Sequence, residues 1–379
     1  MTKKRAIVIG GGIGGLATAI ALRQADLDVE VYERASQLRE VGAGISLWGN
    51  AVRALEHLGL GKQVYKIGFV DVHGSIRTWQ GKPLTHTDMR EVQQRVGAPT
   101  LIMHRAELLN LLFSAFDNGH IVLGKQCVGF RQNTSTVTAQ FADGSEATGD
   151  MLIGADGIHS VIRSHIHGAQ KPRYSGYTGW RCIIPFPKER MTPGESLGRG
   201  ARFGQAPMSQ GRLYWFATKN ATEGSRSVDD EKAELLRTFR GWHSPIEEII
   251  ESSDEQAIIR RDIYDRPPLR TWGVGRVTLL GDAAHPMTPN LGQGACLALE
   301  DAVVLARHLS KESNIHTALR AYESARKART SSILQRAWWV GAIGQLQHPV
   351  LVQLRDIFIK QVVSHLQTHE IVKMAGYQF

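Results

Sequence analysis

Two glycine-rich turns carry residue types suited to binding phosphate and negative charge. The first is GGGIGG at residues 10–15, and the second is GQG at residues 292–294, at the end of the stretch GDAAHPMTPNLGQG. Glycines let backbone amides approach a phosphate closely, and the N-terminus of a following helix attracts negative charge. Either one long dinucleotide touches both turns, or each turn binds its own ligand.

The first turn has the spacing of a dinucleotide-binding site. Residues 10–15 satisfy GxGxxG, in which the first glycine permits the turn, the second admits a pyrophosphate, and the third lets helix and strand pack. Glu33 ends the next apolar run, where its carboxylate can accept hydrogen bonds from a ribose. It would repel a 2′-phosphate, although Arg34 follows it directly. The turn therefore favours the adenosine diphosphate part of FAD or NAD.

The second turn distinguishes between these two ligands. Asp282 follows an apolar run and can accept hydrogen bonds from the hydroxyls of a sugar or a ribityl chain. Pro289 helps to fix an irregular loop before Gly292 and Gly294 open a helix. Amides at that helix start stabilise negative charge, which a reduced flavin carries near N1 and a nicotinamide ring lacks. The sequence therefore predicts one FAD stretched between the two turns.

A third signature, IGADGIHSVIR at residues 153–163, places Asp156 after another apolar run. Taken in their order, the three motifs resemble those of the single-component FAD-dependent monooxygenases, the group A flavoprotein hydroxylases. The resemblance covers nearly the whole chain. It is greatest to the branch that includes salicylate and urate hydroxylases and zeaxanthin epoxidases.

The resemblance implies a reaction. NADH or NADPH would reduce FAD, O2 would add to form a C4a-hydroperoxide, and its distal oxygen would pass to an electron-rich carbon. The sequence has no second GxGxxG, which agrees with a transient visit by the nicotinamide cofactor. Asp156 is similar to the family's residue near both the FAD pyrophosphate and the nicotinamide route. The residues that the resemblance places against FAD are Gly12, Gly14, Gly15, Glu33, Arg34, Arg105, Asp282, Pro289, Gly292 and Gly294.

Three polar residues of a strand-rich region are candidates for contacts with the substrate, namely Arg181, Arg202 and Tyr214. An arginine there could hold a phenolate or a carboxylate and enrich an aromatic ring with electrons. Because side chains alternate between the two faces of a strand, each of the three could instead lie in a surface ion pair or at a strand edge. The aromatic residues of the same strands are expected in the core: Trp180, Phe203, Trp215 and Phe216.

These features predict an FAD-dependent monooxygenase that hydroxylates or epoxidises a hydrophobic, aromatic small molecule. A flavin-dependent oxidase or dehydrogenase, or a flavoprotein that binds without turnover, is the alternative, because GxGxxG and Glu33 suit all of them. His285 in the second loop is expected to be structural. Urate hydroxylases resemble this loop but have an acid in place of Asn290, which argues against urate and brings the loop closer to the epoxidase pattern.

Hydrophobic periodicity predicts the elements that position these residues. Buried strands are predicted at residues 5–10, 27–33, 151–156 and 276–281. Helices are predicted at residues 17–25, 51–60, 105–116, 228–241 and 292–345. Further strands are predicted at residues 174–186 and 211–219, with a hairpin at 120–142. Asn50 is expected to cap the second helix.

The fold class that follows is α/β. We expect a Rossmann-like FAD-binding domain made of residues 1–172 and 271–379, with a β-sheet substrate domain of residues 173–270 inserted into it and a helical C-terminal segment. The stretch 337–354 is amphipathic and carries two tryptophans. It could rest on lipid, but packing across the first domain is its expected use.

The composition is that of a globular protein, with 379 residues of which 42% are hydrophobic. A net charge of +9 could suit a polyanion, an anionic membrane or a phosphate-bearing ligand, but the basic residues are scattered and no nucleic-acid motif occurs. Three cysteines without metal-like spacing suit a reducing cytoplasm and predict no metal site. We expect a cytoplasmic protein without nucleic-acid partners or stable membrane insertion.

Overall fold

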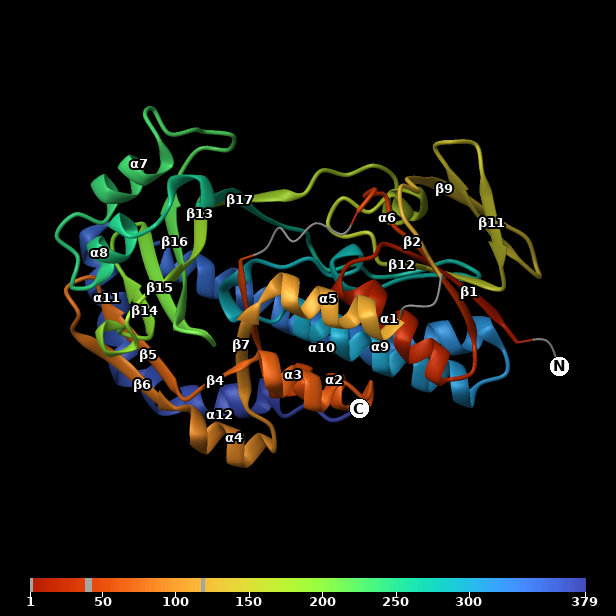
Figure 1. Ribbon diagram of the computed structural model, residues 1–379, viewed down its shortest axis with the longest axis horizontal. Coiled ribbons are helices and arrows are strands. Elements are labelled where there is room, and N and C mark those ends of the chain that lie inside the picture. The colour runs from red at the N-terminus through yellow and green to blue at the C-terminus, as the bar shows by residue number, and fades with distance from the viewer. Residues whose placement is uncertain (1–2, 38–42, 117–119) are drawn as a thin grey trace.

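A parallel sheet forms the centre of one half of the molecule in the computed structural model, which describes residues 3–37, 43–116 and 120–379 (Figure 1). The sheet has five strands in the order β18-β12-β1-β2-β8. Their bounds are β1 Arg5–Ile9, β2 Asp28–Tyr32, β8 Ile121–Val122, β12 Met151–Gly154 and β18 Val277–Leu279. The strands are short, and β1, β12 and β18 are almost wholly apolar, as expected for parallel strands buried on both faces. The predicted buried strands are thus confirmed.

Helices cover this sheet and supply most of its core. The helix α1 packs against α9 and α5, and α9 also packs against α2 and α10. The bounds are α1 Ile13–Gln24, α2 Gly49–His57, α3 Gly61–Ile67, α5 Arg105–Phe116, α6 Val161–His167, α9 Gly294–Lys311 and α10 Ile315–Gly344. Leu16 and Leu299 are fully buried in the core that α1, α9 and the sheet share. The predicted helical stretches of this half are therefore confirmed.

The predicted cap at Asn50 is wrong. The helix α2 begins at Gly49, and Trp48 holds the capping position. The Asn50 side chain is fully buried and its Nδ2 donates to Gln293 Oε1 at 3.0 Å and to Glu300 Oε1 at 2.5 Å. The Asn50 amide therefore bonds to side chains at the start of α9 and within it instead of to the local backbone. The local sequence does not reveal this tertiary contact.

A seven-stranded sheet forms the other half, in the order β17-β13-β16-β15-β14-β5-β6. Residues 173–270 provide five of these strands, and residues 73–88 provide β5 and β6 through a parallel pairing of β14 with β5. The bounds are β5 His73–Thr78, β6 Pro83–Asp88, β13 Arg173–Pro185, β14 Gly194–Leu197, β15 Ala201–Pro207, β16 Arg212–Asn220 and β17 Ile259–Asp265. The sheet therefore extends beyond the region from which we expected it to form.

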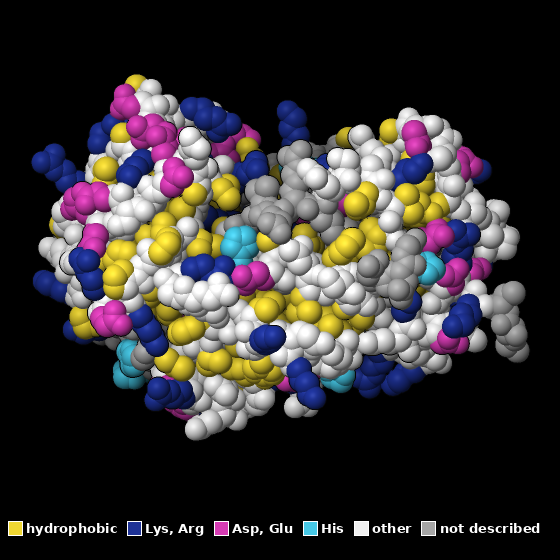
Figure 2. All heavy atoms as spheres, viewed as in Figure 1, with side chains coloured by type: hydrophobic (Ala, Val, Ile, Leu, Met, Phe, Trp, Pro, Cys, Tyr) yellow, Lys and Arg dark blue, Asp and Glu magenta, His cyan; other side chains and the backbone are white. Residues whose placement is uncertain are grey.

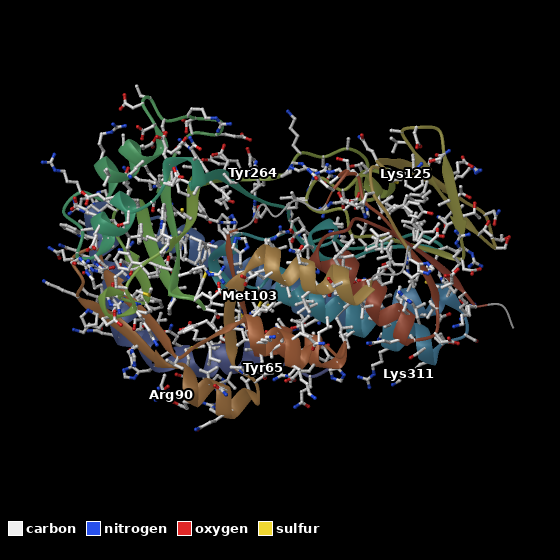
Figure 3. The ribbon with its side chains drawn as sticks, in the orientation of Figure 1. Tyr65, Arg90, Met103, Lys125, Tyr264 and Lys311 are labelled. Atoms are coloured by element: carbon white, nitrogen blue, oxygen red, sulfur yellow. The ribbon has the colours of Figure 1, made fainter. Side chains whose placement is uncertain are left out.

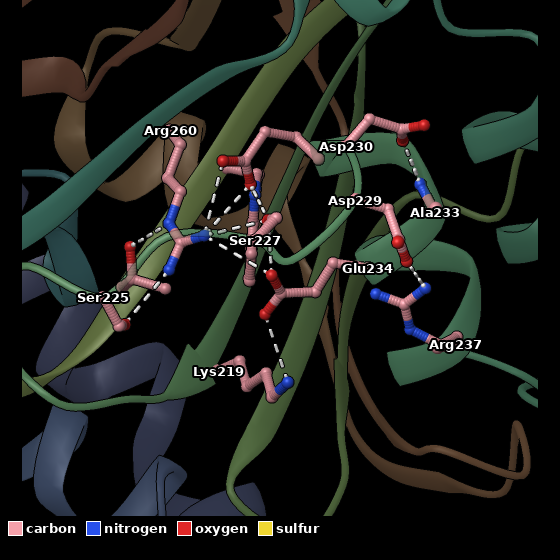
Figure 4. A network of polar contacts seen from close by, with 12 residues as sticks. Lys219, Ser225, Ser227, Asp229, Asp230, Ala233, Glu234, Arg237 and Arg260 are labelled. Atoms are coloured by element: carbon pink, nitrogen blue, oxygen red, sulfur yellow. Dashed lines mark hydrogen bonds and ion pairs between the residues drawn. The ribbon is translucent and has the colours of Figure 1, made fainter.

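Two short helices, α7 Glu231–Thr238 and α8 Ile246–Glu251, cover one face of the seven-stranded sheet. Trp180, Trp215 and Phe239 are fully buried between them. A polar network joins α7 to the sheet: Arg260 Nη1 lies 3.2 Å from Glu231 and 3.4 Å from Glu234 (Figure 4). The charged helix predicted near 228–241 is thus present in a shorter form.

Two three-stranded sheets complete the strands. One consists of β9 Cys127–Gln132, β10 Val137–Phe141 and β11 Glu146–Gly149, and the other of β3 Gly44–Leu47, β7 Thr100–His104 and β4 Phe69–Asp71. The first contains the predicted hairpin. In Figure 3, Lys125 marks the side of the molecule that carries this sheet, Tyr264 lies on β17, and Met103 on β7 lies below Tyr264.

The C-terminal segment is helical, as expected. It contains α11 Pro349–Phe358, a π-helical turn at Ile359–Val363 and α12 Ser364–Ala375, and α12 packs on α4 Met89–Val96 and on β6. Residues 337–344 pack against the first domain as expected, because the Ala337 carbonyl accepts from the Asn290 amide at 2.9 Å, but the outer side of the stretch is open, with Trp339 61% and Leu354 57% exposed. The inner side of α11 instead contacts the half that contains the seven-stranded sheet.

Charge and thiols add little to the surface chemistry. Lys and Arg side chains are spread among acidic ones over the face shown in Figure 2 and do not gather in one stripe.

All three cysteines are buried, and burial raises the pKa of Cys296 to about 12. Within the described residues, no group of three or more His, Cys, Asp or Glu could hold a metal. No described helix is both long and apolar enough to cross a membrane.

Candidate cofactor and substrate site

Four loops of the central sheet meet at one edge. They follow β1, β2, β12 and β18, which are parallel and therefore end on the same side. This is the edge at which open α/β sheets bind ligands. The loops bring the glycines at 10–15 together with Glu33, Asp156 and Asp282, although these residues come from distant parts of the sequence.

The glycines of the first turn fall into two kinds. A Cβ on Gly15 would lie 1.9 Å from the Gly10 carbonyl oxygen, so this glycine allows α1 to pack against β1. Gly10 has φ +113°, and its Cβ would lie 2.4 Å from the Ala155 oxygen. Gly12 instead has no atom within 4 Å of its Cβ position. The backbone at Gly12 therefore faces open space, as a phosphate site requires.

Two carboxylates beside this turn have protein partners. Glu33 accepts from the Gly11 amide at 2.7 Å and from the Ala35 amide at 2.9 Å. Asp156 accepts from Ser160 Oγ at 2.5 Å and from the Val161 amide at 2.7 Å, at the start of α6. Neither lines the main cavity of the site.

A cavity of about 570 Å³ lies between the central sheet and the seven-stranded sheet. Ten of the residues that we singled out from the sequence line it: Gly12, Gly14, Arg105, Arg181, Arg202, Tyr214, Asp282, Pro289, Gly292 and Gly294. The structure therefore brings both glycine turns and all three candidate substrate residues to one place. Gly15, Glu33, Arg34 and Asp156 lie outside this lining.

The cofactor side of the cavity offers both an acceptor and a donor. Asp282 lines the cavity, which accounts for its exposed surface. The protein that surrounds its carboxylate separates it from bulk water and so raises its pKa. Burial also lowers the pKa of Arg105, whereas attraction to Asp282 raises it. The buried Nε1 of Trp48 has no partner in the described part of the chain and lies beside Gly292. A ligand rich in hydroxyl and carbonyl groups would satisfy these groups.

Arg202 joins the substrate side to the second loop. Its side chain is 3% exposed, and its guanidinium donates to Asn290 Oδ1 at 2.6 Å and to Glu195 Oε1 at 3.1 Å. The Asn290 amide in turn donates to the Ala337 carbonyl at 2.9 Å. An acid at position 290 could not make that donation, so the site is built for an amide here.

Successive side chains of β16 alternate between the cavity and the core of the seven-stranded sheet. Tyr214 and Phe216 face the cavity, whereas Trp215 between them is fully buried in the opposite core. Phe203 and Trp215 are in the core as predicted, but the same prediction for Phe216 is wrong. Arg181 pairs with Phe216 across β13 and β16 and also lines the cavity. The wall is thus aromatic with two guanidinium groups.

A family profile described as "FAD binding domain" matches residues 3–337. The chain belongs to this family. It is 41% identical to an aurachin C monooxygenase/isomerase from Stigmatella aurantiaca over 94% of both chains, and 36% identical to an FAD-dependent urate hydroxylase from Klebsiella pneumoniae over 88% of both. The crystal structure of Klebsiella pneumoniae HpxO with FAD and uric acid matches 98% of this chain and 96% of that one, with TM-score 0.93 and 31% identity.

The predicted resemblance, fold and enzyme class are therefore confirmed: the chain is an FAD-dependent monooxygenase, and FAD is its cofactor. The residues that this structure places around the cavity also fit FAD. Gly12 leaves room for a phosphate, Asp282 offers an acceptor, and Trp48, which lines the same cavity, has a buried Nε1 without a partner in the described residues.

A buried ionic network supports the second loop of the monooxygenase. His285 Nε2 lies 2.6 Å from Asp301 Oδ2, and the same carboxylate oxygen accepts from the Gly281 amide at 3.1 Å. Arg326 Nε lies 2.7 Å from Asp301 Oδ1. Burial alone would raise the pKa of Asp301, but His285 and Arg326 hold it below its usual value. His285 is 3% exposed and faces this network, as expected of a structural residue.

The sequence did not single out Trp48, Gly44 or Glu195, which also line the cavity. Gly44 lies so close to Tyr214 that a Cβ would come within 2.3 Å of the ring. An isolated tryptophan in ISLWGN was the one available signal for Trp48. The positions of Gly44 and Glu195 in the lining depend on how β3 and the seven-stranded sheet come together, which the sequence does not show.

Two alanine substitutions should distinguish the glycine that leaves space for a phosphate from the glycine that lets α1 pack on β1. Gly12→Ala is expected to leave the apoprotein as stable as the wild type and to weaken FAD binding at least about tenfold, because the methyl group would occupy phosphate space. Gly15→Ala should lower the free energy of unfolding by about 1–3 kcal/mol, because α1 must move away from β1. Thermal denaturation and FAD titration of the apoproteins measure both. Wild-type FAD affinity in Gly12→Ala would show that the pyrophosphate lies elsewhere.

Proposed function

We propose that this monooxygenase uses NADH or NADPH and O2 to hydroxylate or epoxidise a hydrophobic, aromatic small molecule. The observation that carries the proposal is the composition of the cavity, in which a cofactor-binding edge faces a wall that contains Tyr214 and Phe216. Bound FAD, once reduced, supplies the activation of oxygen. The remaining tasks of the protein are to orient the substrate and to exclude water.

On this proposal, residues 1–172 and 271–379 hold FAD, and residues 173–270, whose sheet is extended by β5 and β6, hold the substrate. Gly12 and Gly14 would face the pyrophosphate, and Asp282 would accept from the ribityl hydroxyls. Further assigned contacts with FAD are Gly15, Glu33, Arg34, Arg105, Pro289, Gly292 and Gly294. Asp156 would lie between the pyrophosphate and the route of the nicotinamide.

The substrate wall would act by position and charge. Arg181 lines the cavity close enough to Tyr214 and Arg105 for its positive charge to act on the pKa of both. A phenolate or carboxylate would find its counter-charge there, and the aromatic side chains would pack on a ring. Relatives are named for aurachin C, urate and zeaxanthin, so the family accepts varied substrates. The hydrogen bonds of the Asn290 amide argue against a urate site that requires an acid at this position.

A panel of ligands tests this proposal. Under air, the purified holoenzyme should consume NADH or NADPH slowly alone and faster with a fitting member of a set of phenols, hydroxybenzoates, indoles, quinolones and terpenoids. Absorbance at the nicotinamide band measures the rate. Reduction of the flavin by an organic substrate without nicotinamide would instead assign an oxidase. Neither response across the panel would leave a flavoprotein that only binds.

A further inference from the structure

The turn that opens α9 has little of its own to hold it in one conformation. Two of its three residues are glycines, and Gly292 has φ +61°, which glycine adopts without strain. The first amides of a helix have no acceptor inside it, and within the described residues no side chain caps α9. Gly294 and Ala295 carry two of these amides and line the cavity. The position of these amides therefore depends on how Gln293, the third residue of the turn, is held.

Asn50 on α2 holds Gln293. Its Nδ2 donates to Gln293 Oε1 at 3.0 Å, and both side chains are fully buried. In the part of the chain that the structure describes, Asn50 is the one residue to which the Gln293 side chain is hydrogen bonded. Neither residue lines the cavity. A contact behind the cavity wall thus fixes the one residue of the turn that is not a glycine.

Asn50 is in turn fixed by a buried carboxylate. Its Nδ2 also donates to Glu300 Oε1 at 2.5 Å, about two turns further along α9. Glu300 is fully buried and lies 2.6 Å from Arg326 and 2.7 Å from Arg329, both on α10. Asn50 therefore links the turn to the buried ionic network between α9 and α10.

This arrangement leaves two polar atoms without partners. Asn50 Oδ1 and Gln293 Nε2 are buried, and neither forms a hydrogen bond within the described residues. Buried polar atoms of this kind lower stability, and apolar side chains of similar size would avoid that loss. A buried amide pair that lowers stability beside a cofactor cavity is typical of a functional role.

We propose that Asn50 is a positioning residue for FAD. By holding Gln293, it fixes the first amides of α9 against the end of the flavin that becomes negatively charged on reduction. The proposal rests on the proposed contact between the Gly292–Gly294 turn and FAD. A helix start stabilises negative charge only over a short distance, so a small displacement of its amides weakens the effect. Loss of Asn50 should therefore weaken the binding of reduced FAD more than that of oxidised FAD.

The double variant Asn50→Leu/Gln293→Met tests this proposal. It replaces both amides with apolar side chains of similar size, so its melting temperature should stay close to that of the wild type. We expect the loss of affinity for reduced FAD to be about threefold to tenfold larger than the loss for oxidised FAD. The two-electron midpoint potential of the bound flavin, measured against a reference dye, should therefore fall by about 15–30 mV.

Ser253→Ala is the matched control for an effect of stability alone. Ser253 is 2% exposed, does not line the cavity, and accepts from Trp215 Nε1 at 3.0 Å in the core of the seven-stranded sheet. Its variant should melt at a lower temperature, because a buried indole donor loses its acceptor. The midpoint potential should match that of the wild type.

Gly292→Ala separates this proposal from the proposed contact with FAD. A Cβ at this φ is strained and would lie 3.0 Å from Trp48 Nε1, so the turn itself should move and the potential should fall. If only Gly292→Ala lowers the potential, the turn contacts FAD but Asn50 does not position it, and the proposal is overturned. If neither Gly292→Ala nor the double variant changes the potential, the contact with FAD is overturned as well. A lower potential in both, at a wild-type melting temperature of the double variant, supports the proposal.

Discussion

Arg326→Met is expected to lower the free energy of unfolding by about 3–5 kcal/mol. The guanidinium of Arg326 is fully buried on α10, 2.6 Å from Glu300 and 2.7 Å from Asp301, and both carboxylates are also fully buried. The variant would leave two carboxylates close together at low dielectric with one cation fewer. Because Asp301 accepts from Gly281 and contacts His285, the second loop should loosen as well.

Arg336→Met on the same helix is the control. Arg336 pairs with Glu370 at 2.6 Å, but both side chains are almost half exposed. Such a pair contributes about 0–1 kcal/mol. Denaturant unfolding followed by tryptophan fluorescence compares the two variants. Equal losses would mean that the buried network has no special role in holding α10 against α9.

Arg202→Ala is expected to lower kcat/KM for product formation about hundredfold while FAD still binds. Arg202 lines the cavity and fixes Asn290 in the loop after Asp282, so its loss would displace both the substrate wall and this loop. Arg202→Lys should recover little, because lysine cannot reproduce contacts to Asn290, Glu195 and Thr218 at once.

The control for this prediction lies on the neighbouring strand. Arg212 pairs with Glu107 at 2.9 Å and does not line the cavity, so Arg212→Ala should keep wild-type kinetics. Product yield, nicotinamide consumption and bound flavin are measured together. If Arg202→Ala lost flavin and activity in parallel, Arg202 would support the cofactor and not the substrate.

The elements of the cofactor half could be predicted because their signals are local. Apolar runs such as those of β1 and β12 lie next to the glycines and acids that they position, and parallel strand ends collect these residues at one edge. The choice of Asp282, Gly292 and Gly294 as a group also rested on short sequence spacing. The structure places all three in the same cavity lining.

The substrate half could not be predicted to the same depth because its contacts are long-range. Nothing in the local pattern of β5 indicates that it pairs with β14, more than 100 residues away. For the same reason, alternation identified the possible faces of β16 without showing that Phe216 takes the cavity side. Asn50 has a side chain suited to capping, but the buried acceptor Glu300 determines its conformation.

The most direct test of the proposed reaction is the source of the oxygen in the product. With a ligand that stimulates NADH or NADPH consumption, the holoenzyme is incubated under isotopically labelled dioxygen, and the product is examined by mass spectrometry. We expect the product to gain one oxygen atom that carries the label. A product whose added oxygen comes from water, or nicotinamide oxidation that yields only hydrogen peroxide with every ligand, would contradict the proposed monooxygenation.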